Sequence, residues 1–222
     1  MKLLIITQRI DINDSVLGFM HGWVEEFAKH CEKVTVVCLQ KGEYNLPKNV
    51  KILSLGKEQA RSKISYVINF YKYIWRERNN YDIVFTHMNP EYVVLAGLLW
   101  KIWGKKIALW YTHKNVDFKL RLAEKLSDII FTASDKSFRL PSKKVNIMGH
   151  GIDIERFAPA TQPVREKIIL SVDRISSTKN QLEIIKLFAA VKEEYSDCRL
   201  YLVGAPALVA DENYFNELKQ YV

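Results

Sequence analysis

Short apolar runs alternate with longer amphipathic segments along nearly the whole chain, and this alternation constrains the fold more than any other feature. The runs do not alternate between apolar and polar residues, which is typical of strands that are buried on both faces of a parallel sheet. A segment with helical spacing follows most of the runs, and parallel strands need such crossover connections. We therefore predict a Rossmann-like α/β fold, with a parallel sheet and helices on both faces.

The limits of the expected elements follow from the apolar runs, the helical spacing and the turn residues between them. The expected strands span residues 3–7, 33–39, 50–55, 82–86, 106–111, 128–132, 144–148, 167–172 and 199–203. The expected helices span residues 19–30, 62–78, 91–103, 117–126, 180–194 and 214–222.

A change of pattern near residue 149 predicts two domains. Residues 149–151 read Gly-His-Gly, and residues 159–163 read Pro-Ala-Thr-Gln-Pro, which is a linker composition. We expect a first domain over 1–158, a linker over 159–166 and a second α/β domain over 167–222. Only two strands are expected in the second domain, and a stable sheet usually needs three or more. We expect this domain to be docked on the first one or to be incomplete.

The charge is concentrated in the first part of the chain. Residues 1–150 carry 24 Lys and Arg against 14 Asp and Glu, whereas residues 151–222 carry 9 against 11. A basic first domain suits an anionic partner, such as a phosphorylated small molecule, an acidic lipid surface or a nucleic acid. The alternative is a surface charge that only keeps the protein soluble. No nucleic-acid-binding motif is present, so we do not expect nucleic acid as a partner.

The N-terminus and the cysteines indicate a cytoplasmic protein. Residues 3–6 are apolar, but this run is shorter than the ~7–15 residues of a secretory signal and lacks a small-residue cleavage site. No apolar run approaches the ~20 residues that span a bilayer. The three cysteines are widely spaced and include no C-x-x-C pair, so we expect them to be reduced.

Several motifs that would define an enzyme class are missing from the sequence. It has no G-x-G-x-x-G after the first strand and no G-x-x-x-x-G-K-[ST], which argues against a dinucleotide dehydrogenase and a P-loop NTPase. It has no H-E-x-x-H, no G-x-S-x-G and no D-x-D, which argues against a zinc protease, a serine hydrolase and a D-x-D metal site. We expect no metal and no cofactor.

Polar residues follow three of the expected strands, at the points where those strands end. They lie in segments 15–18, 87–89 and 112–114. Because ligands of parallel α/β sheets bind beyond the carboxyl ends of the strands, this distribution predicts a binding cleft there. Gly18 precedes an expected helix and would let backbone N–H groups approach a phosphate or a sugar. A plain turn glycine is the alternative for Gly18.

Two cations follow the first strand of the second domain. Arg174 comes just after the strand, and Lys179 lies at the start of the next expected helix. An Arg fork, a Lys point charge and a helix N-terminus together suit a diphosphate. Surface charges on a loop are the alternative interpretation.

These residues also carry a resemblance to a known family. The run GHGIDIERFAP at 149–159, the run ILSVDRI at 169–175 and the later Lys179-Asn180 together resemble the interdomain region of GT-B retaining glycosyltransferases of family 4. The resemblance implies that Arg174 and Lys179 bind the donor diphosphate. It implies that His113 is the catalytic histidine near the donor sugar, with a core histidine as the alternative. Gly18 matches the loop that approaches the donor phosphate or the acceptor.

The resemblance implies transfer of a sugar from a nucleotide-sugar donor to a glycan or lipid-linked acceptor, with retention and without a metal. The expected setting is cell-surface polysaccharide or glycolipid biosynthesis. Asp173 stands where the family usually has glycine, and the family's later pair of spaced glutamates is absent, so we expect an incomplete donor site with weak or no activity. The alternatives are a non-catalytic sugar- or phosphate-binding module and another GT-B enzyme, such as a sugar-nucleotide epimerase.

The expected helix at 62–78 is amphipathic and basic. Its apolar stripe consists of Ile64, Val67, Ile68, Tyr71, Ile74 and Trp75. Residues 57–78 contain six Lys and Arg against two Glu. Such a helix can lie on an acidic membrane, which would make the protein peripheral on the inner face of the cell membrane. A core helix with a solvated basic face is the alternative.

Overall fold

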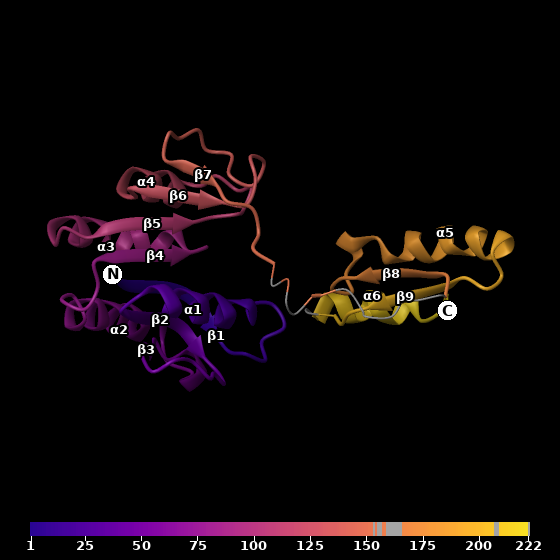
Figure 1. The fold of residues 1–222 in the computed structure, drawn as a ribbon, viewed down its shortest axis with the longest axis horizontal. Helices are drawn as coiled ribbons and strands as arrows, with labels where there is room; N and C mark the ends of the chain where they lie inside the picture. The colour runs from indigo at the N-terminus through magenta and orange to yellow at the C-terminus, as the bar shows by residue number, and fades with distance from the viewer. Residues whose placement is uncertain (153, 155–156, 159–165, 207–208, 222) are drawn as a thin grey trace. The chain divides into compact units, whose positions relative to one another are not determined.

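The structure is a computed structural model that describes residues 1–152, 154, 157–158, 166–206 and 209–221. The chain divides into two compact units, Met1–Ile152 and Asp153–Val222 (Figure 1). The expected linker at 159–166 falls almost entirely on residues outside the described ranges. The limits of the two domains and of the linker therefore stay predictions.

The first unit is built on a seven-stranded sheet in which every pairing is parallel. The strand order is β3-β2-β1-β4-β5-β6-β7, so the chain starts at the interior strand β1, adds β2 and β3 on one side and then adds β4 to β7 on the other. The strands are β1 (Lys2–Ile10), β2 (Lys33–Lys41), β3 (Val50–Ser54), β4 (Ile83–His87), β5 (Lys106–Trp110), β6 (Ile129–Thr132) and β7 (Val145–Ile147). The order of the strands and their parallel direction confirm the Rossmann-like fold class.

Helices cover both faces of this sheet, which explains why successive residues of its central strands are buried. On one face, Leu4 and Ile6 of β1 share a core with helices α2 (Lys63–Arg76), α3 (Pro90–Ile102) and α4 (Phe118–Leu126). On the other face, Leu3 and Ile5 share a core with helix α1 (Phe19–His30). A short 3-10 turn, η1 (Lys57–Gln59), precedes α2.

Local sequence explains where these helices begin. The Ser62 side chain accepts the N–H of Ser65 at the start of α2, and Asp117 accepts the N–H of Leu120 at the start of α4. Both are preferred N-cap residues because their oxygens satisfy otherwise unpaired N–H groups. Pro90 opens α3, where its fixed φ favours the helix and its missing N–H costs nothing.

The apolar stripe predicted on α2 is split by the structure. Phe70 and Ile74 are fully buried under the helix, whereas Ile64, Ile68 and Trp75 are exposed. The Phe70–Ile74 side of the helix faces the core, because both residues belong to one buried cluster with Leu4 of β1. Phe70 also meets the rings of Tyr92 and Trp100 on α3. The apolar surface of α2 is therefore wider than the side that the core covers.

The second unit contains β8 (Ile168–Val172) and β9 (Arg199–Val203), which pair in parallel. The 3-10 turn η2 (Ser177–Lys179) and α5 (Gln181–Glu194) connect them, and α6 (Val209–Leu218) follows β9. The helix expected at 214–222 is thus misplaced, since α6 begins at Val209 and ends at Leu218. Asp211 and Glu212 lie in its first turn, where acidic side chains stabilise the helix dipole. None of the helices in the described ranges has the length and hydropathy needed to cross a bilayer.

Candidate functional site

A ring cluster occupies the carboxyl edge of the first unit's sheet. His87 is the last residue of β4 and is buried. Its ring lies 5.7 Å from Phe19 and 5.7 Å from Trp23, centroid to centroid, in edge-on contacts with the first turns of α1. Trp23 in turn contacts Trp110, the last residue of β5, at 4.9 Å. The cluster therefore joins α1 to the ends of two central strands.

Burial keeps His87 neutral near pH 7. Removal from water lowers the pKa of His87 to about 4, because the charged imidazolium loses its hydration there. The Nδ1 atom of His87 lies 3.4 Å from the hydroxyl of Thr7 on β1, which is its hydrogen-bond partner. His87 is thus a neutral hydrogen-bonding ring in an aromatic setting rather than a cation that binds phosphate.

The two residues after His87 tie three strands together. Gln8 on β1 donates from Nε2 to the Asn89 carbonyl oxygen Oδ1 at 2.7 Å, and Asn89 donates from Nδ2 to the His87 carbonyl at 2.7 Å. Met88 has φ of 59° and donates its N–H to the Trp110 carbonyl at 2.8 Å. A non-glycine residue in this left-handed region is uncommon and is held by its surroundings. These hydrogen bonds connect the ends of β1, β4 and β5 at this edge. The binding cleft expected there stays a prediction.

Gly18 lies at the N-cap of α1, and the loop before it is closed by Asp14. The Asp14 carboxylate pairs with Arg9 of β1 and accepts the N–H of Leu17 at 2.6 Å. Burial opposes ionisation of Asp14, but the hydrogen bonds from Leu17 and Arg9 outweigh it and lower the pKa of this carboxyl. A Cβ at Gly18 would come 2.6 Å from the Asp14 carbonyl oxygen. Gly18 is thus needed for space, since its φ of −55° is open to any residue.

His113 lies in the segment after β5, three residues past the end of the strand. It is exposed, and its Nδ1 accepts the N–H of Asn115 at 3.2 Å. An Nδ1 that accepts carries no proton, so the neutral ring has its proton on Nε2, where it can donate to a ligand. The neighbouring ring of Tyr111 lies 6.4 Å away. His150, which follows β7, lies 6.4 Å from Trp110.

Arg174 and Lys179 belong to one loop of the second unit, between β8 and α5. Both side chains are exposed. The Nζ of Lys179 lies 2.7 Å from Oδ1 of Asp173, the residue that replaces the glycine expected from the resemblance. Asn180 has φ of 55°, so the helix begins at Gln181, one residue later than predicted. The two cations thus lie on one loop beyond the carboxyl end of β8, and one of them already has a carboxylate partner.

Gln181 is buried beside this loop and holds it by two hydrogen bonds. This residue was not selected from the sequence. It is 1% exposed, donates from Nε2 to the Arg174 carbonyl at 2.8 Å and accepts the N–H of Ser176 at 3.4 Å. Across the loop, a Cβ at Gly204 would overlap the Asp173 carbonyl oxygen at 1.8 Å. A polar residue at the first position of a helix was the available signal, but it is also common on exposed helix ends.

The ring cluster was missed for a different reason. Phe19 and Trp23 are four residues apart and therefore read as an ordinary core stripe on α1. Their contact with His87 depends on how α1 crosses the sheet.

As for metals, no three His, Cys, Asp or Glu side chains in the described ranges group together as a metal site requires. The expectation of a metal-free site stays a prediction.

Comparisons with known proteins give similar structures but no similar sequence. No family model and no curated protein matches the chain. The structure of Anabaena HepE in complex with UDP is similar with a TM-score of 0.70 at 17% identity, over 100% of this chain and 65% of that one. A glycosyltransferase from Rickettsia africae is similar with a TM-score of 0.66 at 14% identity, over 99% and 64%.

A third similar structure is the UDP-GlcNAc 2-epimerase from Methanocaldococcus jannaschii, with a TM-score of 0.56 at 13% identity, over 100% of this chain and 69% of that one. The chain thus spans about 65% of the length of HepE. At these identities the similarity shows a shared fold, and it includes both the seven-stranded unit and the second α/β unit. The predicted fold class is confirmed over the whole chain.

Proposed function

We propose that this chain is part of a GT-B glycosyltransferase, resembling family 4, that transfers a sugar from a UDP-sugar to an acceptor with retention. The observation that carries the proposal is the loop between β8 and α5, which presents Arg174 and Lys179 at the carboxyl end of a parallel strand. Ligands of such sheets bind at that end. The similarity in fold to HepE, which was solved with UDP and with UDP-glucose, supports the choice of nucleotide.

The chemistry follows from the charge that develops on the leaving group. As the bond from the anomeric carbon to the diphosphate breaks, negative charge grows on the diphosphate oxygens. Arg174 would bind two of these oxygens with its planar fork, and Lys179 would act as a point charge beside them. Such preorganised groups lower the barrier because they need no reorganisation during the reaction. We propose that these two side chains neutralise the leaving group without a metal.

The proposed acceptor side is the first unit. The proton on Nε2 of His113 would orient a donor-sugar hydroxyl, and the Gly18 loop would approach the donor phosphate or the acceptor. The exposed ring of Phe19 beside the neutral His87 offers an apolar face of the kind that packs against a sugar ring. We propose that a glycan or lipid-linked acceptor binds at this edge. We propose that the protein works in the cytoplasm on cell-surface polysaccharide or glycolipid, at the inner face of the membrane.

An assay with labelled UDP-glucose and related UDP-sugars tests the proposal and its alternatives. The chain is incubated with each donor, with and without a crude lipid and glycan acceptor fraction, and UDP and all sugar products are followed. Acceptor-dependent transfer with the donor's anomeric configuration supports the proposal. Epimerised donor without acceptor supports the epimerase, which the similarity to the Methanocaldococcus jannaschii enzyme keeps as the second candidate. UDP binding without any turnover supports either a binding module or a transferase whose donor site is incomplete, and repeating the assay with a complete donor site separates the two.

A further inference from the structure

Helices α2 and α3 carry an exposed apolar surface on the side turned away from the sheet. Ile64, Ile68 and Trp75 of α2 are 73%, 60% and 58% exposed, and Leu98 and Ile102 of α3 are 66% and 78% exposed. On each helix the spacing places these residues along one side. Single exposed apolar residues are ordinary, but five large ones on two neighbouring helices make a patch of the kind that marks an interaction site.

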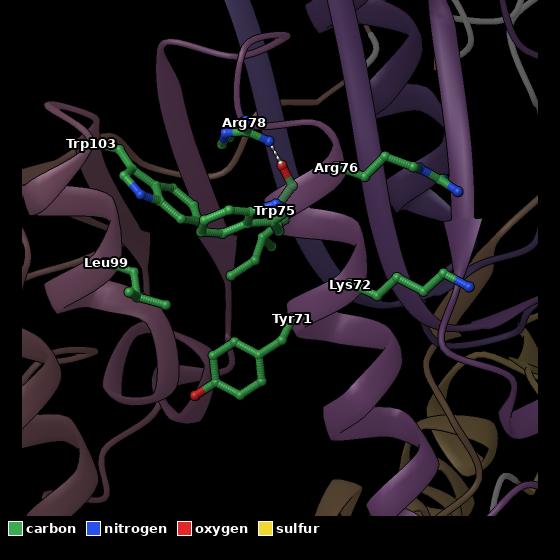
Figure 2. Close-up of a pocket in the computed structure, with 8 residues that line it drawn as sticks. Tyr71, Lys72, Trp75, Arg76, Arg78, Leu99 and Trp103 are labelled. Atoms are coloured by element: carbon green, nitrogen blue, oxygen red, sulfur yellow. Dashed lines mark hydrogen bonds between the residues drawn. The ribbon is translucent and has the colours of Figure 1, made fainter.

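The two helices are joined, so their stripes form one surface. Tyr71 of α2 donates from its hydroxyl to the Leu95 carbonyl of α3 at 2.8 Å. Trp75 and Trp103, at the ends of the helices, meet edge-on with their ring centroids 5.6 Å apart. Figure 2 shows the residues that line the groove between the helices, with the indole rings of Trp75 and Trp103 reaching toward each other from the ends of the two helices. We call this surface the α2–α3 face and define it by Ile64, Ile68, Trp75, Leu98, Ile102 and Trp103.

Cations border the α2–α3 face. Arg78 stacks over the Trp75 ring at 4.7 Å and donates to the Trp75 carbonyl at 3.0 Å, while Lys72 and Arg76 extend along the other side of α2 (Figure 2). Arg76 pairs with Glu77. Within the described part of the chain, no carboxylate lies within ion-pair distance of Lys72 or Arg78. The border of the face therefore carries positive charge that neighbouring residues leave uncompensated.

We propose that the α2–α3 face binds the surface of an anionic lipid membrane. Indole rings favour the level of the lipid headgroups, where one edge is apolar and the other is wet. Aliphatic side chains beside them can enter the acyl boundary, as on helices that lie in the interface plane. Lys and Arg at the border gain from anionic headgroups, by roughly a fivefold increase in affinity per cation. Apolar centre, aromatic ends and cationic border all occur on this one face.

The charge argues against a second copy of the chain as the occupant. A two-fold dimer would place the same patch against itself. The uncompensated Lys72 and Arg78 of both copies would then face each other, and like charges brought together weaken an interface. An anionic lipid surface has the opposite sign and so complements the border.

The face leaves the carboxyl edge of the sheet free. Because α2 and α3 each return from the carboxyl end of one strand to the start of the next, their C-termini lie at the opposite edge. Trp75 and Trp103 lie at those C-termini, away from His87. A membrane on the α2–α3 face would thus lie along the side of the first unit. This inference rests on the proposed location at the inner face of the membrane and deepens it by naming the surface that binds lipid, while its vesicle test needs no glycosyl transfer.

Co-sedimentation with vesicles tests the inference. We expect the chain to pellet with vesicles of phosphatidylglycerol and phosphatidylcholine in equal parts, and to stay in solution with phosphatidylcholine alone. Replacing both border cations, Lys72→Gln with Arg78→Gln, should weaken binding about 25-fold. The control pair Lys48→Gln with Lys143→Gln removes the same charge from exposed lysines on other elements and should bind within a fewfold of the wild type.

The apolar part of the face is tested with Ile68→Ser and Leu98→Ser together, since both residues are exposed and their loss should leave the melting temperature nearly unchanged. We expect this pair to pellet far less than the wild type. The inference is overturned if the wild type ignores both vesicle types, or if the control pair loses as much binding as the border pair. It is also overturned if ultracentrifugation shows a dimer that the Ile68→Ser and Leu98→Ser changes dissociate, because a second copy would then cover the face.

Discussion

The Nζ of Lys179 lies 2.7 Å from Oδ1 of Asp173, so the lysine proposed to bind the donor diphosphate already has an anionic partner. Both side chains are well exposed, and an exposed pair of this kind contributes about 0–1 kcal/mol. A bound diphosphate would have to replace the carboxylate or share the lysine with it. Asp173 therefore competes with the donor diphosphate for the Lys179 ammonium.

Replacing Asp173 by Asn should increase the affinity for UDP about two- to fivefold, because Lys179 loses its competing carboxylate while the loop keeps a residue of the same size. Isothermal titration at low salt measures the change. The gain should disappear in the double variant with Lys179→Ala. An equal gain in that double variant would show that Asp173 acts by general charge rather than through Lys179.

In a version of the protein with a complete donor site, Arg174→Ala and Lys179→Ala should each lower sugar transfer by about 10²–10³-fold, the size of effect seen when one preorganised charge-stabilising group is removed. Their melting temperatures should stay close to that of the wild type, because both side chains are exposed. Steady-state kinetics and thermal unfolding give the two readouts. Lys186→Ala is a matched control, since that exposed lysine pairs with Glu183 on the same helix that the loop precedes. Unchanged turnover in both loop variants would rule out their role in diphosphate binding.

His87 should make the first unit less stable as the pH falls. Its pKa is about 4 in the folded protein and about 6.5 in an unfolded chain, so the unfolded state binds the proton first. The contribution of neutral His87 to the free energy of unfolding is fully present above pH 6.5. It is lost as the pH falls from 6.5 to 4, by about 3 kcal/mol in total. Urea unfolding at pH 7 and pH 4.5 should show a smaller loss for His87→Phe than for the wild type. An identical loss in both proteins would contradict the buried, neutral state of His87.

Gly18→Ala should destabilise the first unit by about 1–3 kcal/mol, because the new Cβ meets the Asp14 carbonyl oxygen at 2.6 Å and the backbone must shift. Gly22→Ala is the control, since a Cβ at Gly22 meets nothing within 4 Å and alanine favours a helix. Chemical unfolding of the two variants compares them directly. If Gly18→Ala is as stable as Gly22→Ala, the loop is loose rather than closed by Asp14.

The central strands β1, β4 and β5 could be predicted from the sequence because each contains an apolar run that helices cover on both faces. Residues 199–203 were predicted with the limits that the structure gives to β9. The C-terminal end of β1 was predicted at Thr7, three residues before its observed end at Ile10. Arg9 and Ile10 extend it through pairing with Gln40 and Lys41 of β2, and such pairing leaves no local signal.

The candidate site was only partly predictable, for physical reasons that concern particular residues. The cleft at the strand ends follows from parallel topology, so segment 87–89 could be selected in advance. The ion pair of Lys179 could not be predicted, because the rotamer of its side chain decides whether the ammonium meets Asp173 or solvent. The exposure of Trp75 could not be predicted either, since the apolar surface of α2 is wider than the side that the core covers and the sequence does not show which part is buried.

The measurement that tests the central claim most directly is the titration of UDP into the isotopically labelled chain, followed by amide NMR. The proposal predicts saturable shifts for amides between Ser171 and Gln181, and their loss in Arg174→Ala at the same UDP concentration. Binding of UDP elsewhere, or no shifts in this loop at millimolar UDP, would contradict the proposal that this loop holds the donor diphosphate.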